Sequence, residues 1–455
     1  MKFRYLILLC LTMVYVGCSE DEQVNSDIVA KTISIVNVLD HGALGDGVTN
    51  DTQVIQNLLD DTSIQTILFE TNKVFVIDDL TIPSNKTLII DGTLQVNSNM
   101  NYGYEYYNFI YGKNVNDVII TGNGFIDGNK RALNNGYFSL IKFEDSNNIE
   151  VSVKKIGNNR LPNPKHSSLT LGCIYMINCN DVKVQDMTME NWSREGVWLL
   201  NCKDSNINNV DFNGDVDSWS GIQVGDGSNN SVSFCNVKNA GASGISFDTK
   251  FSTLSNCIVE DNTFHHGFNF GHSGLPTENC RISDCISRNS AVNGFNFGFG
   301  SNNNNVSNCH VDNANDKGFN VSNNATNIDF DNISAKQSNV GLALFETSVR
   351  VTNSEFLNNT TFAFFNIGNS ADYVFRNVRL SNDPMQGEIN FTDPEIDFTN
   401  FRISNGNVRK LSKIRLESAQ GNTAVAFLKE IGNGYFVVET ALEPNSSAHL
   451  KYYIE

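Results

Sequence analysis

The chain has 455 residues, of which 40% are hydrophobic, with 34 glycines and only 7 prolines, so we expect one long domain rather than several domains joined by linkers. The formal net charge is −18, and it becomes −20 without residues 1–17, which contain Lys2 and Arg4 but no acidic residue. This charge argues against a nucleic-acid partner, because phosphate binding needs a basic surface. An acidic polymer would need a local basic patch or a bound cation.

The first residues combine two basic side chains with an apolar run, residues 6–16, followed by Gly17 and Cys18. This pattern predicts a cleaved signal peptide over residues 1–17 rather than a membrane-spanning helix. The junction resembles the cleavage box of bacterial lipoproteins, which implies that Cys18 is lipidated and that residues 18–34 are a flexible tether. The resemblance implies an exported protein anchored by lipid at the outer membrane and exposed at the cell surface. The alternative is an ordinary signal peptide with a chance cysteine.

The N-terminal part of the mature chain carries a glycine-rich segment, residues 37–52, that reads Asn-Val-Leu-Asp-His-Gly-Ala-Leu-Gly-Asp-Gly-Val-Thr-Asn-Asp-Thr. It closely resembles the opening signature of the pectate lyase-like superfamily of single-stranded right-handed β-helices. In that superfamily the segment leads into a helix that caps the open end of the coil. Here Thr49 or Asn50 would cap a helix with an apolar face of Val54, Ile55, Leu58 and Leu59.

A glycine followed by apolar, variable and apolar residues recurs along the middle of the chain. The glycines lie 23 to 27 residues apart, and all fourteen positions one and three residues after them are apolar. Alternation of period two predicts short strands with one buried face. Recurrence every two dozen residues, without a helical pattern, predicts coils stacked in parallel. The glycines are Gly196, Gly221, Gly244, Gly267, Gly294, Gly318 and Gly341.

A second strand follows several of these glycine strands, and four of the second strands end in a cysteine at the same register, namely Cys235, Cys257, Cys285 and Cys309. Cysteines of an exported protein can pair as disulfides. However, stacked coils lie about 4.8 Å apart, and a free cysteine packs as a small hydrophobic residue. We therefore expect ladders of free cysteines inside the coil, with disulfides as the alternative.

Together these patterns predict an all-β fold, a single-stranded right-handed parallel β-helix over residues 35–383 with an N-terminal capping helix. Beyond Pro384 the repeat fades, and short alternating strands over residues 384–455 predict a small C-terminal β cap or accessory unit.

Outward-facing residues beside the glycine strands are the candidates for a binding groove, because register brings outward residues of neighbouring coils together. Aromatic rings and amides on one face are typical of sugar binding, and four of the seven histidines lie within 46 residues. The alternative is an ordinary solvated face. The candidate substrate-binding residues are Arg194, Glu195, Trp198, Trp219, Gln223, Asn269, His272, Asn296 and Lys317.

The candidate catalytic residues lie between residues 244 and 296, where the longest coil also carries an extra loop, residues 271–278. Loops that depart from a repeat commonly carry function. The stretch Ile-Ser-Phe-Asp-Thr-Lys, residues 245–250, is similar to a strand-ending motif of mannuronan C5-epimerases, in which a histidine stands where this chain has lysine. The candidate catalytic residues are Asp248, Lys250, His265 and His266.

Uronate chemistry explains why these residue types are of interest. β-Elimination needs one group that neutralises the carboxylate, a base for the C5 proton and an acid for the departing O4. Epimerisation uses the same carbanion-like intermediate. Lysine or histidine can be the base, Lys317 or Arg194 would neutralise charge, and Asp248 would orient a base or hold a cation. Calcium is the expected cation if one is used, with oxygen ligands among Asp226, Asp248, Glu260 and Asp261.

We therefore expect a monomeric extracellular enzyme acting on an acidic polysaccharide, either a polysaccharide lyase or a C5-epimerase. One alternative is a glycoside hydrolase, for which Asp226 and Asp248 on adjacent coils would be the pair of carboxyl groups. The other is a surface protein that binds a glycan without catalysis. Alginate, pectin and other uronate glycans all remain open as the polymer.

Overall fold

A computed structural model describes residues 35–98, 106–129, 137–159, 172–215, 218–271, 274–322, 324–345, 347–367, 372–380, 386–391, 401–404, 413–418, 425–432, 435–441 and 448–454. Within these ranges no helix is both long enough and apolar enough to cross a membrane. The expected signal peptide, the tether and Cys18 lie outside the described residues.

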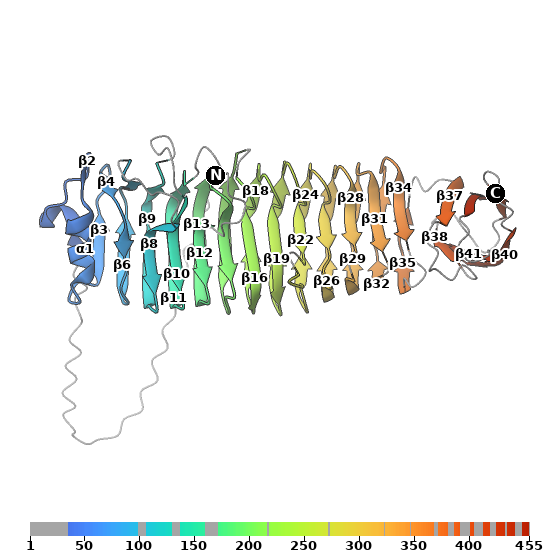
Figure 1. Cartoon of the computed structure of the whole chain (residues 1–455), viewed down its shortest axis with the longest axis horizontal. Helices are drawn as coiled ribbons and strands as arrows, with labels where there is room; N and C mark the ends of the chain where they lie inside the picture. Colours follow the sequence, from blue (N-terminus) through green and yellow to red (C-terminus); the bar gives the residue numbers. More distant parts are fainter. Residues whose placement is uncertain are drawn as a thin grey trace, which may run out of the picture. The chain divides into compact units, whose positions relative to one another are not determined.

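The described chain opens with short elements that precede the first full coil (Figure 1). The helix buries Ile55, Leu58 and Leu59 against the core, while Val54 is partly buried, so the predicted apolar face is confirmed. These elements are β1 (Ile35–Asn37), the 3-10 helix η1 (Val38–His41), β2 (Asp46–Asn50) and α1 (Thr52–Asp60).

The expected cap of this helix was wrong in its position. The boundary residue is Asp51, whose carboxylate accepts hydrogen bonds from the backbone N–H groups of Leu44 (2.7 Å) and Gly45 (3.0 Å) rather than from the helix. Asn50 accepts a hydrogen bond from the N–H of Thr52 at 3.0 Å. The aspartate therefore fastens the glycine-rich loop to the start of the helix.

Each coil adds one strand to a parallel sheet of 12 strands (Figure 1). Register is continuous from coil to coil, so that Val197 pairs with Ile222 and Ile222 with Ile245. The strands are β5 (Leu80–Thr81), β8 (Tyr106–Lys113), β10 (Tyr137–Glu144), β12 (Gly172–Ile177), β14 (Glu195–Leu200), β16 (Ile222–Ser228), β19 (Ile245–Lys250), β22 (Phe268–Phe270), β25 (Phe295–Phe297), β28 (Lys317–Val321), β31 (Val340–Phe345) and β34 (Phe362–Ile367).

The rest of each coil belongs to a 24-stranded sheet. Its middle coils change from one long strand to two short ones, since β15 pairs with β17 through Asn206 and Ser231 and with β18 through Asp211 and Asn236. Besides β1 and β2 it contains β3 (Thr66–Phe69), β4 (Val74–Ile77), β6 (Lys86–Ile90), β7 (Thr93–Val96), β9 (Asn116–Asp127), β11 (Asn147–Gly157), β13 (Asn180–Glu190), β15 (Asn206–Asn213), β17 (Ser231–Ser233), β18 (Asn236–Lys238), β20 (Thr253–Ser255), β21 (Ile258–Glu260), β23 (Arg281–Ser283), β24 (Ile286–Arg288), β26 (Asn302–Ser307), β27 (His310–Asp312), β29 (Thr326–Asp331), β30 (Ser334–Lys336), β32 (Ser348–Thr352), β33 (Glu355–Leu357), β35 (Asp372–Arg376) and β36 (Arg379–Leu380).

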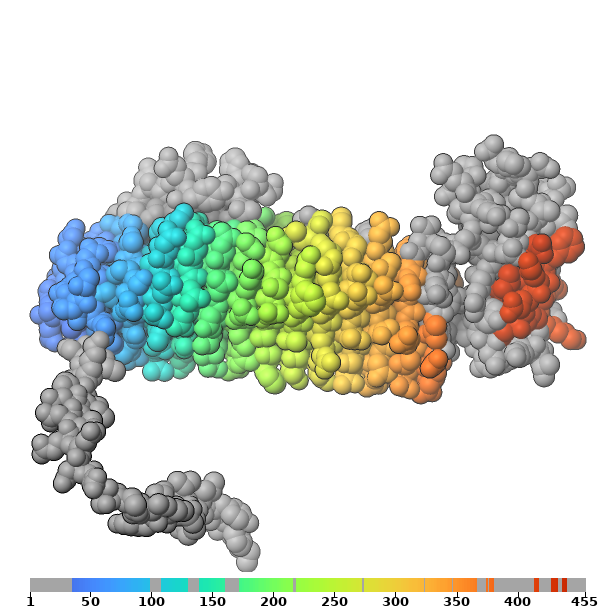
Figure 2. All heavy atoms as spheres, turned by 90° about the horizontal axis from the view of Figure 1, so that it is seen from below, coloured from blue at the N-terminus to red at the C-terminus, as the bar shows by residue number. Residues whose placement is uncertain are grey.

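Figure 2 shows the stacked coils from outside as successive bands of colour. The core runs along the inside of these coils. The apolar residues one and three positions after each repeat glycine are fully buried. Phenylalanine rings stack between coils: the ring centroids of Phe268 and Phe295 are 4.6 Å apart, and those of Phe295 and Phe319 are 4.9 Å apart. A Cβ on Gly244 would lie 2.2 Å from the Val259 side chain, so the repeat needs glycine at this corner. The eight described cysteines are free and buried, which confirms the prediction of cysteine ladders.

The C-terminal strands form two small antiparallel sheets within the described residues. Residues 435–438, an alternating stretch inside the segment predicted to form short strands, lie in β41. One sheet contains β37 (Gln386–Phe391), β42 (Ala448–Ile454) and β39 (Ile414–Ser418), and the other contains β38 (Phe401–Ser404), β41 (Tyr435–Ala441) and β40 (Val425–Gly432).

Candidate functional site

Outward side chains of the 12-stranded sheet line up from coil to coil. The residue two positions after each repeat glycine pairs in register with its counterpart, and Tyr175 extends the row by one coil. Val197 and Leu199, on either side of Trp198 in the chain, are fully buried, so this row points away from the core. We call it the central ladder: Tyr175, Trp198, Gln223, Ser246, Asn269, Asn296 and Asn320.

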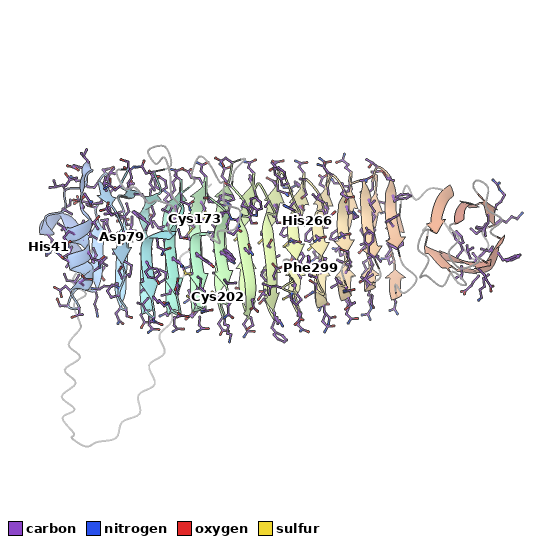
Figure 3. All side chains as sticks on the ribbon, in the orientation of Figure 1. His41, Asp79, Cys173, Cys202, His266 and Phe299 are labelled. Atoms are coloured by element: carbon purple, nitrogen blue, oxygen red, sulfur yellow. The ribbon has the colours of Figure 1, made fainter. Side chains whose placement is uncertain are left out.

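A second row, which we call the edge ladder, lies one residue before each repeat glycine. The two ladders touch, because the side-chain amide of Asn293 donates to Oδ1 of Asn296 at 3.2 Å. Within the edge ladder, the N–H of Asn293 donates to Nδ1 of His266 (3.4 Å), and the N–H of Lys317 donates to Oδ1 of Asn293 (3.2 Å). Figure 3 labels His266 on the middle coils. The edge ladder contains Glu195, Ser220, Ser243, His266, Asn293 and Lys317.

Aromatic rings occupy the first part of the central ladder. Tyr175 and Trp198 stack with their ring centroids 4.7 Å apart, and the ammonium group of Lys142 lies 5.7 Å from the Tyr175 ring. Both rings are more than nine-tenths buried although they point away from the core. Neighbouring groups therefore hold these rings in place and leave only a small part of each ring for contact with a sugar.

A buried acid, Glu195, lies on the same strand as Trp198. Glu195 is 4% exposed, and burial raises the pKa of its carboxyl to about 7, although Arg194 and the N–H of Ser220 favour the charged form. The hydrogen bond from Ser220 to the carboxylate is long, 3.4 Å. The Arg194 guanidinium lies 5.0 Å from the ring of Trp219, which is 44% exposed. Near neutral pH this carboxyl is therefore protonated in a large fraction of molecules.

The extra loop after residue 271 reaches the aromatic end of the face. A Cβ built on Gly225 would lie 3.8 Å from Nε1 of Trp198 and 3.9 Å from a methyl group of Leu275, so the loop covers this glycine next to the indole. Asp248 is 1% exposed and accepts a hydrogen bond from the N–H of Gly271 at 2.8 Å. Its carboxylate thus fixes the start of the same loop.

Amides occupy the other end of the central ladder. Asn296 donates to Asn269 at 2.8 Å, and Asn320 donates to Asn296 at 2.7 Å. Asn320 also donates to Ser322 at 3.1 Å, whereas its buried Oδ1 has no partner among the described residues. This chain of amides presents donors and acceptors at the coil spacing, which suits the hydroxyl groups of a sugar chain.

The structure therefore brings together most of the predicted site residues. Trp198, Gln223, Asn269 and Asn296 lie on the central ladder, and Glu195, His266 and Lys317 lie on the edge ladder. Arg194, Trp219 and His265 occupy the residue just before the edge ladder, with the His265 ring 6.0 Å from that of His266. His272 lies outside the described residues.

Two predicted cations are already paired, which weakens the roles proposed for them from sequence. Lys250 forms an ion pair with Glu278 at 3.0 Å, and a protonated amine held by a carboxylate is a poor base. Lys317 is paired with Asp316 and lies 5.8 Å from the ring of Phe345. Neither ammonium group is free to bind a substrate carboxylate without giving up this partner.

The expected calcium ligands do not converge. Asp226 and Asp248 lie within β16 and β19 of the 12-stranded sheet. Glu260 ends β21 in the other sheet and is held by Lys238 and Arg288. Asp261, next in the chain, accepts a hydrogen bond from Asn289 at 2.8 Å. Among the described residues no group of three or more His, Cys, Asp or Glu side chains is arranged to hold a metal ion. The four candidates do not form one site, because Asp226 and Asp248 belong to one sheet and Glu260 and Asp261 lie at the other.

A surface hollow of about 390 Å³ lies on the other sheet, away from both ladders. Its charged groups, Asp329 and Arg350, pair with each other at 3.4 Å, and its other lining residues are asparagines, a serine and two valines. We place the candidate site on the ladders instead, because the titratable, aromatic and unpartnered polar groups gather there.

Sequence reasoning missed three members of this face. Tyr175 went unrecognised because Cys173 replaces the repeat glycine in its coil, as the pairing of Ile174 with Val197 shows. The alternation of Ile174, Tyr175 and Met176 carried the signal. Lys142 and Leu275 had no signal in the repeat, since one lies in an earlier coil and the other in an irregular loop.

Comparison with known proteins agrees with this architecture. Residues 172–335 match the family model described as a right handed beta helix region. The tailspike protein of Escherichia coli bacteriophage HK620, solved in complex with a pentasaccharide, aligns with a TM-score of 0.53 at 12% identity, covering 92% of this chain and 93% of that one. The mannuronan C-5 epimerase AlgE6 A-module of Azotobacter vinelandii aligns with a TM-score of 0.48 at 10% identity, covering 76% and 98%. No curated protein matches the sequence. At these identities the likeness shows the fold alone, and the chain is a right-handed parallel β-helix.

Proposed function

We propose that this right-handed parallel β-helix protein binds an acidic polysaccharide along the central ladder and acts on its uronate residues by β-elimination or C5-epimerisation. The observation that carries the proposal is the face on which stacked rings and a chain of amides share one register, with His266 on the adjoining edge ladder and His265 next to it. A sugar chain laid along the stack would meet the rings first and the amides next. The tailspike with a bound pentasaccharide supports glycan binding by this fold, and the face supports it for this chain.

The two histidines suit different roles in this chemistry. Because Nδ1 of His266 accepts a hydrogen bond from the Asn293 N–H, the neutral ring carries its proton on Nε2 and acts as a donor. His265 is exposed, so we assign it the removal of the C5 proton. In β-elimination the released electron pair forms the C4–C5 double bond, the C4–O4 bond breaks, and O4 takes a proton from water while His266 donates a hydrogen bond to it.

The test is to incubate the full chain with oligogalacturonate and with mannuronate and guluronate oligomers, with and without calcium, and to follow the ultraviolet absorbance of the unsaturated product. We expect the absorbance to rise, and His265→Ala to lower the rate by about a hundredfold or more, because a general base contributes that much. His310→Ala is the matched control, since His310 is an exposed histidine on the other sheet bonded to Ser334 at 2.8 Å.

Other outcomes would redirect the assignment. New reducing ends without absorbance would contradict elimination and indicate hydrolysis, and proton exchange at C5 without cleavage would indicate epimerisation. Equal loss in the two histidine variants would contradict the role of His265. If the panel is bound but left unchanged, the face is a recognition surface and not an active site.

Hydrolysis is the second candidate, and register favours it at one place. Gly225 pairs with Asp248, so Asp226 and Asp248 lie on adjacent coils, one residue out of line. A glycoside hydrolase requires two carboxyl groups about 5 to 9.5 Å apart, a separation within reach of side chains on coils about 4.8 Å apart. The reducing-end assay on Asp226→Asn and Asp248→Asn tests it, since hydrolysis by this pair requires both variants to be inactive.

We also propose that the protein works outside the cell, anchored through a lipid on Cys18. The support is the apolar run followed by glycine and cysteine at residues 17 and 18. Metabolic labelling with a radioactive fatty acid should mark the wild type but not Cys18→Ser. Labelling of both would contradict the anchor.

A further inference from the structure

The 24-stranded sheet carries the hollow of about 390 Å³ on its outer surface, across successive coils near the end of the stack. These coils contribute β26, β29, β32 and β35, which Figure 1 labels one after another. One wall of the hollow is a row of outward side chains in continuous register: Asn305 pairs with Asp329, Asp329 with Arg350, and Arg350 with Val374. The repeat therefore lines this wall with four different outward side chains at the coil spacing.

The second wall stands two residues earlier in the chain, near the start of each strand, and consists of Asn303, Asn327 and Ser348. The two asparagines have left-handed backbones, with φ of 56° and 52°, which asparagine adopts with little strain. The residue between the two walls points inward, as the buried side chains of Ile328 and Val349 show. The hollow exists because this alternation leaves its floor without an outward side chain.

The walls carry hydrogen-bonding groups that the described part of the chain leaves unused. The side-chain amide of Asn305 and the hydroxyl of Ser348 have no hydrogen-bond partner among the described residues. Asn303 and Asn327 each donate to an asparagine of the preceding coil, at 3.4 and 3.0 Å, so their own carbonyl oxygens remain available as acceptors. The hollow therefore offers donors and acceptors side by side.

A charged pair lies in the middle of the first wall. Nη1 of Arg350 is 3.4 Å from Oδ2 of Asp329, and these side chains are 59% and 47% exposed. This single long contact leaves other guanidinium nitrogens and Oδ1 of Asp329 for a ligand. The pair carries no net charge, and the carboxylate would repel an anion. Since Val374, at the end of the wall, is 41% exposed, the hollow suits a neutral ligand that is rich in hydroxyl groups and has an apolar face.

We propose that this hollow is a second glycan-binding site, which takes a neutral pyranose ring of an oligosaccharide. A sugar hydroxyl both donates and accepts, so two neighbouring hydroxyls match the Asp329 carboxylate, the Arg350 guanidinium and the Asn305 amide. The carbon atoms of the ring would contact Val374. The volume is at the lower end of the range for small-molecule sites, about 300 to 1,000 Å³, which fits a short stretch of sugar rather than a long chain.

This site is separate from the face that carries the two ladders. The ladders lie on the 12-stranded sheet, whereas β26, β29, β32 and β35 belong to the other sheet. A neutral glycan in the hollow would leave the ladders open to an acidic polysaccharide, so the protein could hold both at once. The inference goes beyond the proposed function and does not depend on it.

The test is isothermal titration calorimetry of the full chain at pH 7 with cello-, manno-, xylo- and galacto-oligosaccharides as neutral probes. We expect at least one probe to bind the wild type and Arg350→Ala to weaken that binding about tenfold or more, because the hydrogen bonds of a charged group are lost. Lys336→Ala is the matched control, since Lys336 is an exposed cation of the same sheet that pairs with Asp312 at 3.4 Å outside the hollow. It should bind as the wild type does, and so should His265→Ala.

Each other outcome overturns the proposal in a distinct way. A folded wild type that binds none of the probes has no neutral-glycan site. Equal affinities of Arg350→Ala and Lys336→Ala would place the binding outside this hollow, and loss of binding in His265→Ala would place it on the ladders. Tighter binding of a uronate oligomer that Arg350→Ala abolishes would contradict a neutral ligand. None of these results decides between elimination, epimerisation and hydrolysis, which the absorbance and reducing-end assays test separately.

Discussion

Replacing Glu195 by glutamine should stabilise the protein at alkaline pH but not at acidic pH. The pKa of the buried carboxyl rises from its ordinary 4.5 to about 7, so folding favours the acid form. The resulting loss of unfolding free energy, which comes from ionising the buried carboxyl, is absent below pH 4.5, grows as the pH rises toward 7, and is constant above pH 7. At about 1.4 kcal/mol for each pH unit between the two pKa values, the wild type loses about 3 kcal/mol of unfolding free energy at pH 8.

Glu195→Gln cannot ionise and should not pay this penalty. Urea unfolding followed by circular dichroism at pH 5 and pH 8 should show the variant gaining up to about 3 kcal/mol over the wild type at pH 8 and little at pH 5. Glu355→Gln is the matched control, because Glu355 has a 44% exposed side chain and pairs with Arg379 at 3.0 Å, and we expect it to change stability by less than about 1 kcal/mol. Parallel pH profiles for the wild type and Glu195→Gln would refute the assignment of a neutral, buried acid.

Two further predictions separate packing from binding. Gly244→Ala should lower the free energy of unfolding by about 1 to 3 kcal/mol, because the new Cβ would lie 2.2 Å from the Val259 side chain. Gly225→Ala should fold normally, because its Cβ would lie 3.7 Å or more from its neighbours, but it should bind oligosaccharide less well. Equal unfolding midpoints for the two variants would contradict this. Phe234→Asn should stabilise the fold by about 1 kcal/mol, because Phe234 is 57% exposed and has a left-handed backbone, with φ of 54°, that asparagine adopts with less strain. Phe264→Asn is the control, because Phe264 is exposed but lies outside the left-handed region. A similar gain in both variants would contradict relief of backbone strain.

The cysteines illustrate how far the repeat carries an argument from sequence. Cys235 and Cys257 recur at one position of the coil, and the register of β17 with β20 places them on neighbouring coils inside the stack. Their burial follows from that register, because the position faces the inside of every coil, where a free cysteine packs as a small apolar side chain. The aromatic pair escaped the same reasoning only because Cys173 replaced the repeat glycine that marks the coil.

The charged groups show where such reasoning stops. Lys250 and Glu278 are separated by 28 residues and pair because a bridge between coils places them side by side, which the length of the irregular loop between them conceals. Glu260 and Asp248 are only 12 residues apart in the chain, yet they belong to different sheets. Separation in sequence is therefore a poor guide to ion pairs and metal ligands in a coil of this length.

The sequence by itself determined the coil, because a glycine and two apolar residues every two dozen positions allow one inward face and one register. It also determined which side chains share the outward face, since alternation along a strand leaves them no other side. Only the tertiary structure decided which of these groups are free, which are paired and which are deprived of water. Those properties depend on the loops and corners that the repeat does not encode, and they distinguish Glu195, an acid near neutral pH, from a carboxylate on a solvated face.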